Sequence, residues 1–311
     1  MELDAKIYVA GHRGVVGSAI LRKLKSDGYN CIVFKTHDEL NLRDSKAVDD
    51  FFKLEKPDYV FLAAAKVGGI HANDTYPVDF LIYNLEIQNN VISMSALSGV
   101  KKLLFLGSSC VYPKYPKLPI TEDQLMTGVL EPTNDAYAIA KIAGIKLCQS
   151  YNKQFNTNFI SVMPTNVYGP NDNYDLESSH VLAALIRKIS EAKENKSSSI
   201  TLWGTGRPRR EFLHSDDLAE ACIYLMNKYN SSEIINIGTG KEISILDLAQ
   251  KIIAHVEWEL DIINDLTKPD GTLSKVMDNS KILNIGWKPK ISLDEGITMT
   301  LDSYAHEIAQ L

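Results

Sequence analysis

Tyr137 and Lys141 stand four residues apart in residues 135–141, a stretch whose alanines favour a helix. That spacing places both side chains on one face of the helix. A phenol has a reference pKa of about 10, and an ammonium one turn away favours the phenolate and lowers that pKa. The pair therefore predicts a general acid/base, although the same spacing also occurs on solvated helix surfaces.

A glycine-rich turn near the start of the chain predicts a nucleotide site. The apolar strand expected at residues 6–10 leads into Gly11, Gly14 and Gly17, and a helical pattern begins at residue 18. Glycines allow a tight turn and close approach to a pyrophosphate, which then meets the positive end of the helix. A strand before and a helix after are the context that such a motif requires.

The end of the second expected strand, residues 31–34, bears on the choice of cofactor. Folds that prefer NAD usually place an acidic residue there, about 20 residues after the glycines, to bind the ribose 2′-hydroxyl. Here Lys35 and His37 stand at the strand end, acidic residues come slightly late, and Arg13 lies in the glycine loop. Positive groups favour the 2′-phosphate of NADP, although a lysine at a strand end is often simply solvated.

Strand and helix patterns alternate up to residue 170, which predicts an α/β fold with a doubly wound parallel (Rossmann) sheet. We expect residues 1–170 to form an NADP-binding domain, with part of 211–240 returning to it. The alternation then breaks down, and we expect 171–311 to be mainly a smaller, mixed α/β substrate-binding lobe. Ligands bind beyond the carboxyl ends of parallel strands, so Ser108, after the strand at 102–107, should face the site.

Composition excludes several classes of function. The chain has 311 residues, 45% of them hydrophobic, and a formal net charge of −6, which argues against nucleic-acid or anionic-membrane partners. The N-terminus does not read as a signal peptide and we find no membrane-spanning apolar run, so we expect a cytoplasmic protein. The four cysteines lack metal-ligand spacing, so no metal is expected, and all but Cys110 are expected to be buried and inert.

Several longer motifs allow the protein family to be identified more closely. Together they resemble the GDP-L-fucose synthases of the extended short-chain dehydrogenase/reductase superfamily, in which the G-x-x-G-x-x-G spacing is used, and the resemblance covers nearly the whole chain. His37 and Lys188 stand where the family often has arginine, and residues 255–265 lack an expected glycine turn. The motifs that carry the resemblance lie at residues 63–70, 107–114, 131–134, 137–144, 163–170, 210–214 and 268–271.

The resemblance implies NADPH-dependent conversion of GDP-4-keto-6-deoxy-D-mannose to GDP-L-fucose, by epimerisation at carbons 3 and 5 and reduction at carbon 4. It implies that Cys110 and His180 are the base and acid of epimerisation. Cys110 lies two residues after Ser108, which in an extended segment places both side chains on one side. Without the resemblance, His180 reads as a surface residue at a helix start.

For the reduction, the resemblance implies that Tyr137 protonates the carbonyl oxygen, Ser108 hydrogen-bonds it, and Lys141 holds the nicotinamide ribose. The helices at 80–98 and 137–155 are implied to pair two copies as a homodimer. The implied NADP(H)-binding residues are Gly11, His12, Arg13, Gly14, Val15, Val16, Gly17, Lys35, His37, Asn41, Leu42, Ala64, Ala65, Leu106, Gly107, Tyr137, Lys141, Pro164, Thr165, Asn166, Val167 and His180.

The GDP half of the substrate needs an aromatic wall and positive charge. Trp203 and the basic loop expected at residues 204–210 offer both, since arginine forks match diphosphate geometry. An isolated arginine cluster is commonly just solvated, but in an acidic protein beside Trp203 we favour anion binding. The substrate-binding residues implied by the resemblance are Lys188, Trp203, Arg210 and Asp270.

Three alternatives stay open on the residues alone. A 4,6-dehydratase needs an acidic residue just after the active-site serine, where Ser109 and Cys110 stand. A 4-epimerase usually keeps NAD bound and has an acid at the second strand end, against Lys35 and His37. An idle NADP-binding regulator commonly loses the tyrosine or lysine, and both are present here.

Overall fold

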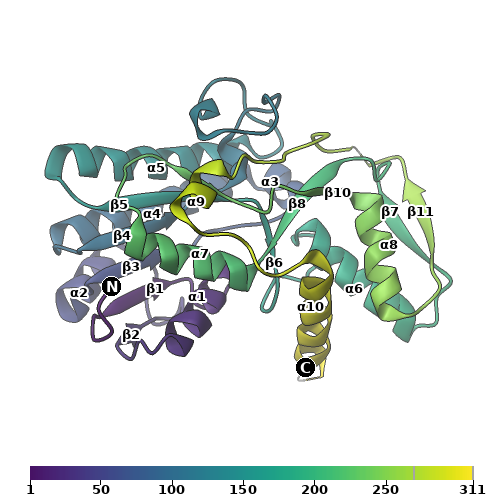
Figure 1. Ribbon diagram of the computed structural model, residues 1–311, viewed down its shortest axis with the longest axis horizontal. Coiled ribbons are helices and arrows are strands. Elements are labelled where there is room, and N and C mark those ends of the chain that lie inside the picture. Colours follow the sequence, from purple (N-terminus) through teal and green to yellow (C-terminus); the bar gives the residue numbers. More distant parts are fainter. Residues whose placement is uncertain (269, 310–311) are drawn as a thin grey trace.

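The computed structural model describes residues 1–268 and 270–309. A six-stranded parallel sheet lies between two layers of helices, and a smaller lobe extends from one end of it (Figure 1). This confirms the predicted fold class. The strands of the main sheet are, in chain order, β1 (Ile7–Ala10), β2 (Ile32–Val33), β3 (Tyr59–Leu62), β4 (Lys102–Leu106), β5 (Phe159–Pro164) and β9 (Ile235–Ile237).

The strands lie in the order β2-β1-β3-β4-β5-β9, and every neighbouring pair is parallel. The winding reverses between β1 and β3, which is the place where ligands bind in such sheets. The helices that connect and cover the sheet are α1 (Val15–Ser26), α2 (Ser45–Glu55), α3 (Ile70–Thr75), α4 (Pro77–Leu97), α5 (Asp135–Phe155), α7 (Ser215–Lys228) and α9 (Ser280–Ile285).

Every strand except the edge strand β2, whose residues are only partly buried, buries side chains on both faces of the sheet, as expected of a parallel sheet covered on both sides. Alternate residues enter two separate cores: Ile7 and Val9 of β1 pack with α1, α7 and α9, whereas Tyr8 and Ala10 pack with α2, α4 and α5. The helices therefore hold the carboxyl ends of the strands at one fixed edge.

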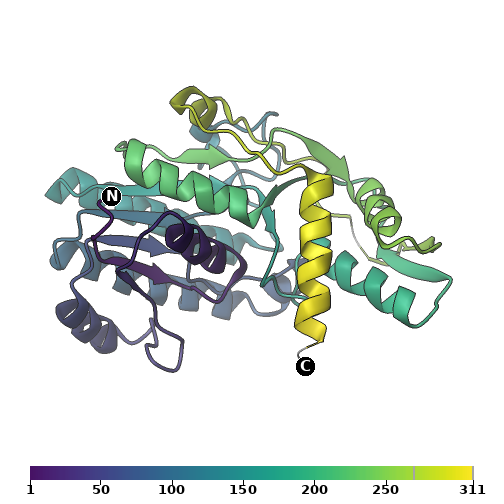
Figure 2. The ribbon, with the colours of Figure 1, turned by 60° about the horizontal axis from the view of Figure 1, so that its bottom comes forward.

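The smaller lobe has a core of its own. In one small sheet β8 pairs in parallel with β6 and antiparallel with β10, and in the other β7 and β11 are parallel. Figure 2 shows α10 standing where the lobe meets the sheet. The elements of the lobe are β6 (Asn166–Tyr168), α6 (Val181–Glu194), β7 (Ser199–Trp203), β8 (Arg209–His214), β10 (Glu242–Ser244), α8 (Ile245–Val256), β11 (Asp261–Asp265) and α10 (Leu293–Ile308).

After β8 the chain returns to the main sheet, where α7 packs on α1 and β9 pairs with β5. Lys102, buried at the start of β4, fastens the end of α7. Its ammonium donates hydrogen bonds to the carbonyl oxygens of Leu225, Met226 and Tyr229, at 3.1, 2.8 and 2.6 Å. The return is thus tied into the centre of the sheet.

Two expectations about local structure were wrong. Arg209 and Arg210 lie in strand β8 rather than in a loop, because the β10 strand pairs with them. The residues after Ser108 form a short 3₁₀ helix, η1 (Ser109–Val111), rather than an extended segment. The Ser108 hydroxyl accepts a hydrogen bond from the Cys110 N–H at 3.2 Å, which stabilises this turn. A second short 3₁₀ helix is η2 (Glu122–Gln124).

Candidate active site

The glycine loop lies at the switch point of the sheet, at the end of β1. A Cβ added to Gly11 would lie 2.6 Å from the Ala64 backbone nitrogen, and one added to Gly17 would lie 2.1 Å from the Gly11 carbonyl oxygen. No side chain caps the first turn of α1 and none of its residues there is acidic. The free N–H groups of that turn fit a diphosphate, so the residues present suit a dinucleotide.

The packing of Gly17 gives a testable consequence. We expect Gly17→Ala to weaken NADPH binding at least tenfold and lower Tm, because the new methyl group collides with backbone that cannot move aside. Gly14→Ala is the matched control for folding, since its Cβ would meet only the Gly11 carbonyl oxygen at 3.7 Å. Fluorescence titration and thermal unfolding of both variants measure the effects, and an unchanged Tm in Gly17→Ala would contradict the argument.

Both basic and acidic side chains lie near the end of β2. The His12 ring stacks on Phe34 with centroids 4.7 Å apart, and burial together with the Arg13 charge lowers the pKa of His12. Lys35 lies 3.9 Å from the Glu39 carboxylate, which also accepts a hydrogen bond from the Thr36 N–H at 2.8 Å. The acidic residue expected to come late thus pairs with Lys35, and His37 is exposed beside it.

Lys141 is the most buried member of the Tyr–Lys pair. Its side chain is 3% exposed, its ammonium donates to the Leu106 carbonyl oxygen at 2.8 Å, and it lies 5.7 Å from the centroid of the Tyr137 ring. Burial lowers the pKa of Lys141 to about 7, opposed by the charge of Cys110. The lysine therefore sits between Tyr137 and the end of β4.

The expectation that Lys141 lowers the pKa of Tyr137 was wrong for the protein alone. Burial raises the pKa of Tyr137, the Cys110 charge raises it further, and the hydrogen bond with Ser108 only opposes this. Desolvation prevails because the phenol and the lysine are both removed from water, and a half-neutral ammonium attracts a phenolate weakly. Tyr137 consequently keeps its proton at neutral pH.

The burial of the Lys141 ammonium lowers the free energy of unfolding, and this effect can be measured. We expect Lys141→Met to raise Tm at pH 7 by a few degrees, because an apolar side chain needs no hydration, while turnover is lost. The unfolded lysine has a pKa near 10.5 and the folded one near 7, so the unfolded chain binds more protons between these values. Wild-type stability should thus rise with pH over this window, and the variant should lack that rise in denaturant titrations. Equal slopes in both proteins would contradict the prediction.

Cys110 faces the same cluster despite the turn in its backbone. The Asn134 amide Nδ2 donates to the Cys110 sulfur at 3.4 Å. A negative charge on Cys110 favours the protonated forms of Tyr137, Lys141 and Arg210, so the three groups lie within electrostatic reach of the sulfur. The structure thus brings Ser108, Cys110, Tyr137 and Lys141 together.

His180 precedes α6, and Ser178, two residues before it, contacts the segment that leads into α3. The Gly69 N–H donates to the Ser178 carbonyl oxygen at 2.8 Å, and a Cβ on Gly68 would lie 3.0 Å from Phe80. Phe80 in turn packs edge-on against Tyr137, with centroids 6.3 Å apart. The His180 side chain is accessible to solvent, yet desolvation by the protein around it lowers its pKa. Within the described residues its ring makes no hydrogen bond to the cluster.

The basic residues of the smaller lobe divide into two groups. Arg210 donates to the carbonyl oxygens of Arg209 and Thr272, at 2.7 and 2.6 Å, and belongs to the Cys110 side. Trp203 is 47% exposed, with Lys188 and Lys268 at 5.3 and 5.1 Å from its ring. The latter group forms a cationic surface around an indole.

Asp270 contacts the loop between β7 and β8. Its carboxylate accepts hydrogen bonds from the Thr205 N–H and hydroxyl at 2.8 and 2.7 Å, so it shapes that loop while remaining exposed. Pro269, within the predicted motif 268–271, lies outside the described residues.

The remaining predicted cofactor residues line the carboxyl edge of the sheet. Asn166 Nδ2 and Thr165 Oγ1 both donate to the Glu211 carbonyl oxygen, at 2.8 and 3.1 Å. The Leu42 carbonyl oxygen accepts from Asn90 at 2.9 Å. The others lie in the β1–α1 loop and α1 (Val15, Val16), after β2 (Asn41), after β3 (Ala65), after β4 (Gly107), at the end of β5 (Pro164) and in β6 (Val167).

Sequence reasoning missed Glu211, whose carboxylate is completely buried where the lobe joins the sheet. It accepts hydrogen bonds from the N–H groups of Met277 and Gly240, at 3.0 and 2.7 Å, and also from that of Thr239. The only available signal was its place beside Arg210 in the 210–214 motif. The carboxylate fixes β8, and with it Arg210, relative to the end of β9.

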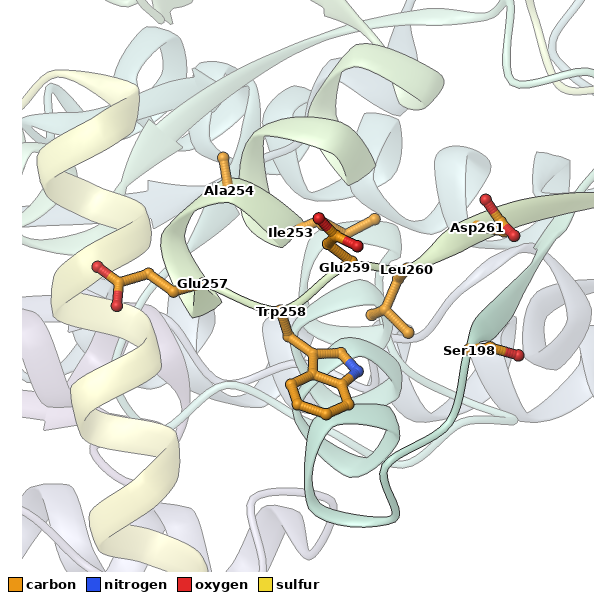
Figure 3. A pocket seen from close by; sticks show the side chains of 8 residues that line it. All are labelled: Ser198, Ile253, Ala254, Glu257, Trp258, Glu259, Leu260 and Asp261. Atoms are coloured by element: carbon orange, nitrogen blue, oxygen red, sulfur yellow. The ribbon is translucent and has the colours of Figure 1, made fainter.

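Figure 3 shows a shallow depression of the smaller lobe that lies apart from this cluster. Trp258 stands at its centre and donates its indole N–H to the Ser197 carbonyl oxygen at 3.0 Å. It falls in the segment that departs from the family pattern. Among the described residues there is no helix long and apolar enough to cross a membrane, and no group of three His, Cys, Asp or Glu side chains placed to hold a metal ion.

Comparison with known proteins agrees with this geometry. The model of the NAD dependent epimerase/dehydratase family matches residues 7–238. GDP-L-fucose synthase 1 of Arabidopsis thaliana is 56% identical, covering 98% of this chain and 94% of its own, and GDP-L-fucose synthase of Escherichia coli K12 is 49% identical, covering 95% of each.

The fold is also similar to that of a solved structure. The GDP-L-fucose synthetase of Naegleria fowleri bound to NADP superposes with a TM-score of 0.91 at 31% identity, covering 99% of this chain and 96% of that one. The chain accordingly belongs to the NAD dependent epimerase/dehydratase family and, within it, to the GDP-L-fucose synthases.

Proposed function

We propose that this protein converts GDP-4-keto-6-deoxy-D-mannose to GDP-L-fucose with NADPH, by epimerisation at carbons 3 and 5 followed by reduction at carbon 4. The observation that carries the proposal is the place of Cys110: it follows Ser108 in the η1 turn and contacts Asn134 at the start of α5, the helix that bears Tyr137 and Lys141. A reductase alone needs the pair, whereas an epimerase that acts through an enolate also needs a base. Identities of about half over nearly full length support the same activity.

The cofactor is NADP(H), and when bound it supplies the hydride. The first turn of α1 and Gly11, Gly14 and Gly17 hold the diphosphate. Arg13, Lys35 and His37 serve the 2′-phosphate, with Glu39 limiting the free charge of Lys35. Residues 164–167, fixed through the Glu211 carbonyl oxygen, flank the nicotinamide.

Epimerisation uses the acidity of the carbons next to the ketone. Cys110 as thiolate removes a proton from carbon 3 or 5, which leaves an enolate, and His180 delivers a proton to the opposite face of that carbon. Arg210 and Lys141 near the sulfur support its negative charge. Because desolvation by the surrounding protein lowers the pKa of His180, lower pH favours its protonated form and therefore proton delivery.

Reduction uses Tyr137 as the acid. Its raised pKa keeps the phenol protonated, and a neighbouring thiolate further disfavours the phenolate. The phenol therefore has a proton to give to the carbonyl oxygen as hydride reaches carbon 4, while Ser108 donates a hydrogen bond to that oxygen. Lys141 holds the nicotinamide ribose and stabilises the phenolate that remains.

The GDP half binds in the smaller lobe. Trp203 provides a face for the guanine, and the ammonium of Lys188, 5.3 Å from the centroid of that ring, supplies positive charge for the diphosphate. Arg210 and Asp270 hold the sugar side and the loop around it. This supports a division into a cofactor domain, residues 1–170 with part of 211–240, and a substrate lobe formed mainly by 171–311.

The protein acts as a homodimer. Exposed apolar side chains on the outer faces of α4 and α5 support pairing through these helices: Val78 is 70%, Ile82 41% and Ile139 49% exposed. The two helices pack side by side along one face of the sheet (Figure 1). Sedimentation equilibrium measures the mass directly, and a monomer at micromolar concentration would contradict this arrangement.

The activity is tested by incubating purified protein with GDP-4-keto-6-deoxy-D-mannose and NADPH, following nicotinamide absorbance and identifying the product sugar. Oxidation of one NADPH per GDP-L-fucose formed is the expected result. If other nucleotide sugars are turned over instead, the scaffold is right but the substrate is wrong. If NADPH binds and no substrate is turned over, the protein is a cofactor-binding regulator.

A further inference from the structure

Asn134 stands at the N-cap position of α5, but its side chain does not cap the helix. It precedes α5 at the N-cap, where an asparagine ordinarily accepts a hydrogen bond from the first turn of the helix. Asp44 and Ser244 do this for α2 and α8, but Asn134 forms no such bond. Its Nδ2 instead donates to the Cys110 sulfur at 3.4 Å. The Asn134 side chain thus contacts the Cys110 sulfur and does not cap α5.

The turn that carries Asn134 is fixed independently of that contact. The Asn134 N–H donates to the Glu131 carbonyl oxygen at 3.0 Å, and its own carbonyl oxygen accepts from the Ala138 N–H at 3.0 Å. The Glu131 carboxylate is held by Lys114 and by the Thr272 hydroxyl, each at 3.1 Å. The amide therefore approaches the sulfur from a backbone that is already in place.

The rest of the amide has no structural partner. Asn134 Oδ1 is buried, and no donor in residues 1–268 or 270–309 reaches it. A side chain kept only to stabilise the fold would be expected to satisfy this oxygen, for instance by capping α5. Among the residues that the structure describes, the contact with the sulfur is thus the one hydrogen bond that the side chain makes.

We propose that Asn134 is a positioning residue that donates its amide N–H to the Cys110 thiolate and orients it toward the substrate. This rests on the proposed role of Cys110 as the epimerisation base. A donor aimed at the anionic form favours that form, and a hydrogen bond to an anion is stronger than one to a neutral thiol. Arg210 and Lys141 stabilise the negative charge of the thiolate, whereas the hydrogen bond from Asn134 fixes the orientation of the sulfur.

The test measures the thiolate without requiring turnover. The rate of alkylation of Cys110 by iodoacetamide is followed against pH in a Cys31→Ser background, since Cys148 and Cys222 are buried. Asn134→Ala should move the midpoint of this profile to higher pH by at least half a unit. Asn134→Asp, which replaces the donor by a negative acceptor, should move it further. Asn195→Asp, at an exposed helix end, is the charge control and should leave it unchanged.

A second readout follows deuterium uptake from D₂O into carbons 3 and 5 of GDP-4-keto-6-deoxy-D-mannose without NADPH. Asn134→Ala should slow uptake at least tenfold while NADPH affinity stays within twofold. Should that variant fold poorly, Asn134→Ser keeps a cap-forming side chain and should still shift the alkylation profile. A folded Asn134→Ala or Asn134→Ser protein with the wild-type profile overturns the proposal.

The proposed roles of Cys110 and Asn134 are tested separately by their own variants. If Cys110→Ser still exchanges deuterium at the wild-type rate, Cys110 is not the base and the proposed function loses its epimerisation step. If Cys110→Ser blocks exchange while Asn134→Ala exchanges and alkylates as the wild type does, only the role of Asn134 is wrong.

Discussion

Tyr137→Phe is expected to lower turnover with GDP-4-keto-6-deoxy-D-mannose and NADPH by about a hundredfold to ten-thousandfold, the usual range for loss of a positioned general acid. Without the hydroxyl, the oxygen on carbon 4 receives no proton as hydride arrives. Epimerisation should continue, since Cys110 is retained, so deuterium should still enter carbons 3 and 5. Loss of nicotinamide absorbance and mass spectrometry of the sugar nucleotide separate the two steps.

The matched control for this variant is Tyr151→Phe on the same helix, where the ring packs against Phe155 and Phe159. It should keep wild-type turnover, and both variants should bind NADPH as the wild type does. Substantial NADPH oxidation by Tyr137→Phe would show that another group supplies the proton, and Ser108 would be the first candidate.

Cys110→Ser should remove epimerisation, with uptake of deuterium at carbons 3 and 5 falling about a hundredfold or more. A serine hydroxyl is far less acidic than a thiol, so the charges of Arg210 and Lys141 cannot make it an effective base at neutral pH. Any sugar that is still reduced should keep the substrate configuration at both carbons. Nuclear magnetic resonance of the product distinguishes these outcomes.

Cys31→Ser is the control, because Cys31 is partly accessible but lies before β2, remote in sequence from the cluster. It should epimerise and reduce normally. GDP-L-fucose formation by Cys110→Ser at near the wild-type rate would mean that epimerisation runs through a different base.

Local pattern was enough to predict most of the fold. The glycine loop, the buried strands and the helix with Tyr137 have clear periodicity, and the alternation of strand and helix restricts the sheet to a parallel one. The pattern could not predict that residues 209–210 pair with β10, because that contact joins segments over thirty residues apart. Nor could it distinguish an extended segment from a 3₁₀ turn after Ser108, which the Ser108 hydroxyl and backbone hydrogen bonds from Val111 and Tyr112 stabilise.

The candidate site was predictable in its residue types and less so in its electrostatics. The spacing of Tyr137 and Lys141 indicates contact, but the sign of the pKa shift depends on burial by β4, which no local pattern reveals. Glu211 and Asn134 were assigned no role, because a lone polar residue looks alike in sequence whether it is solvated, capping a helix or holding a neighbour.

The return of the chain to β9 after the smaller lobe has a consequence for biosynthesis. As residues 1–170 leave the ribosome, β5 is the edge strand of the sheet, paired with β4 but with its other edge open, and the apolar side of α1 that α7 later covers is exposed. Strands and surfaces of this kind invite association with other chains. Protection comes only when the lobe has been synthesised and residues 215–237 dock, so nascent chains stalled between these points are the form most in need of a chaperone.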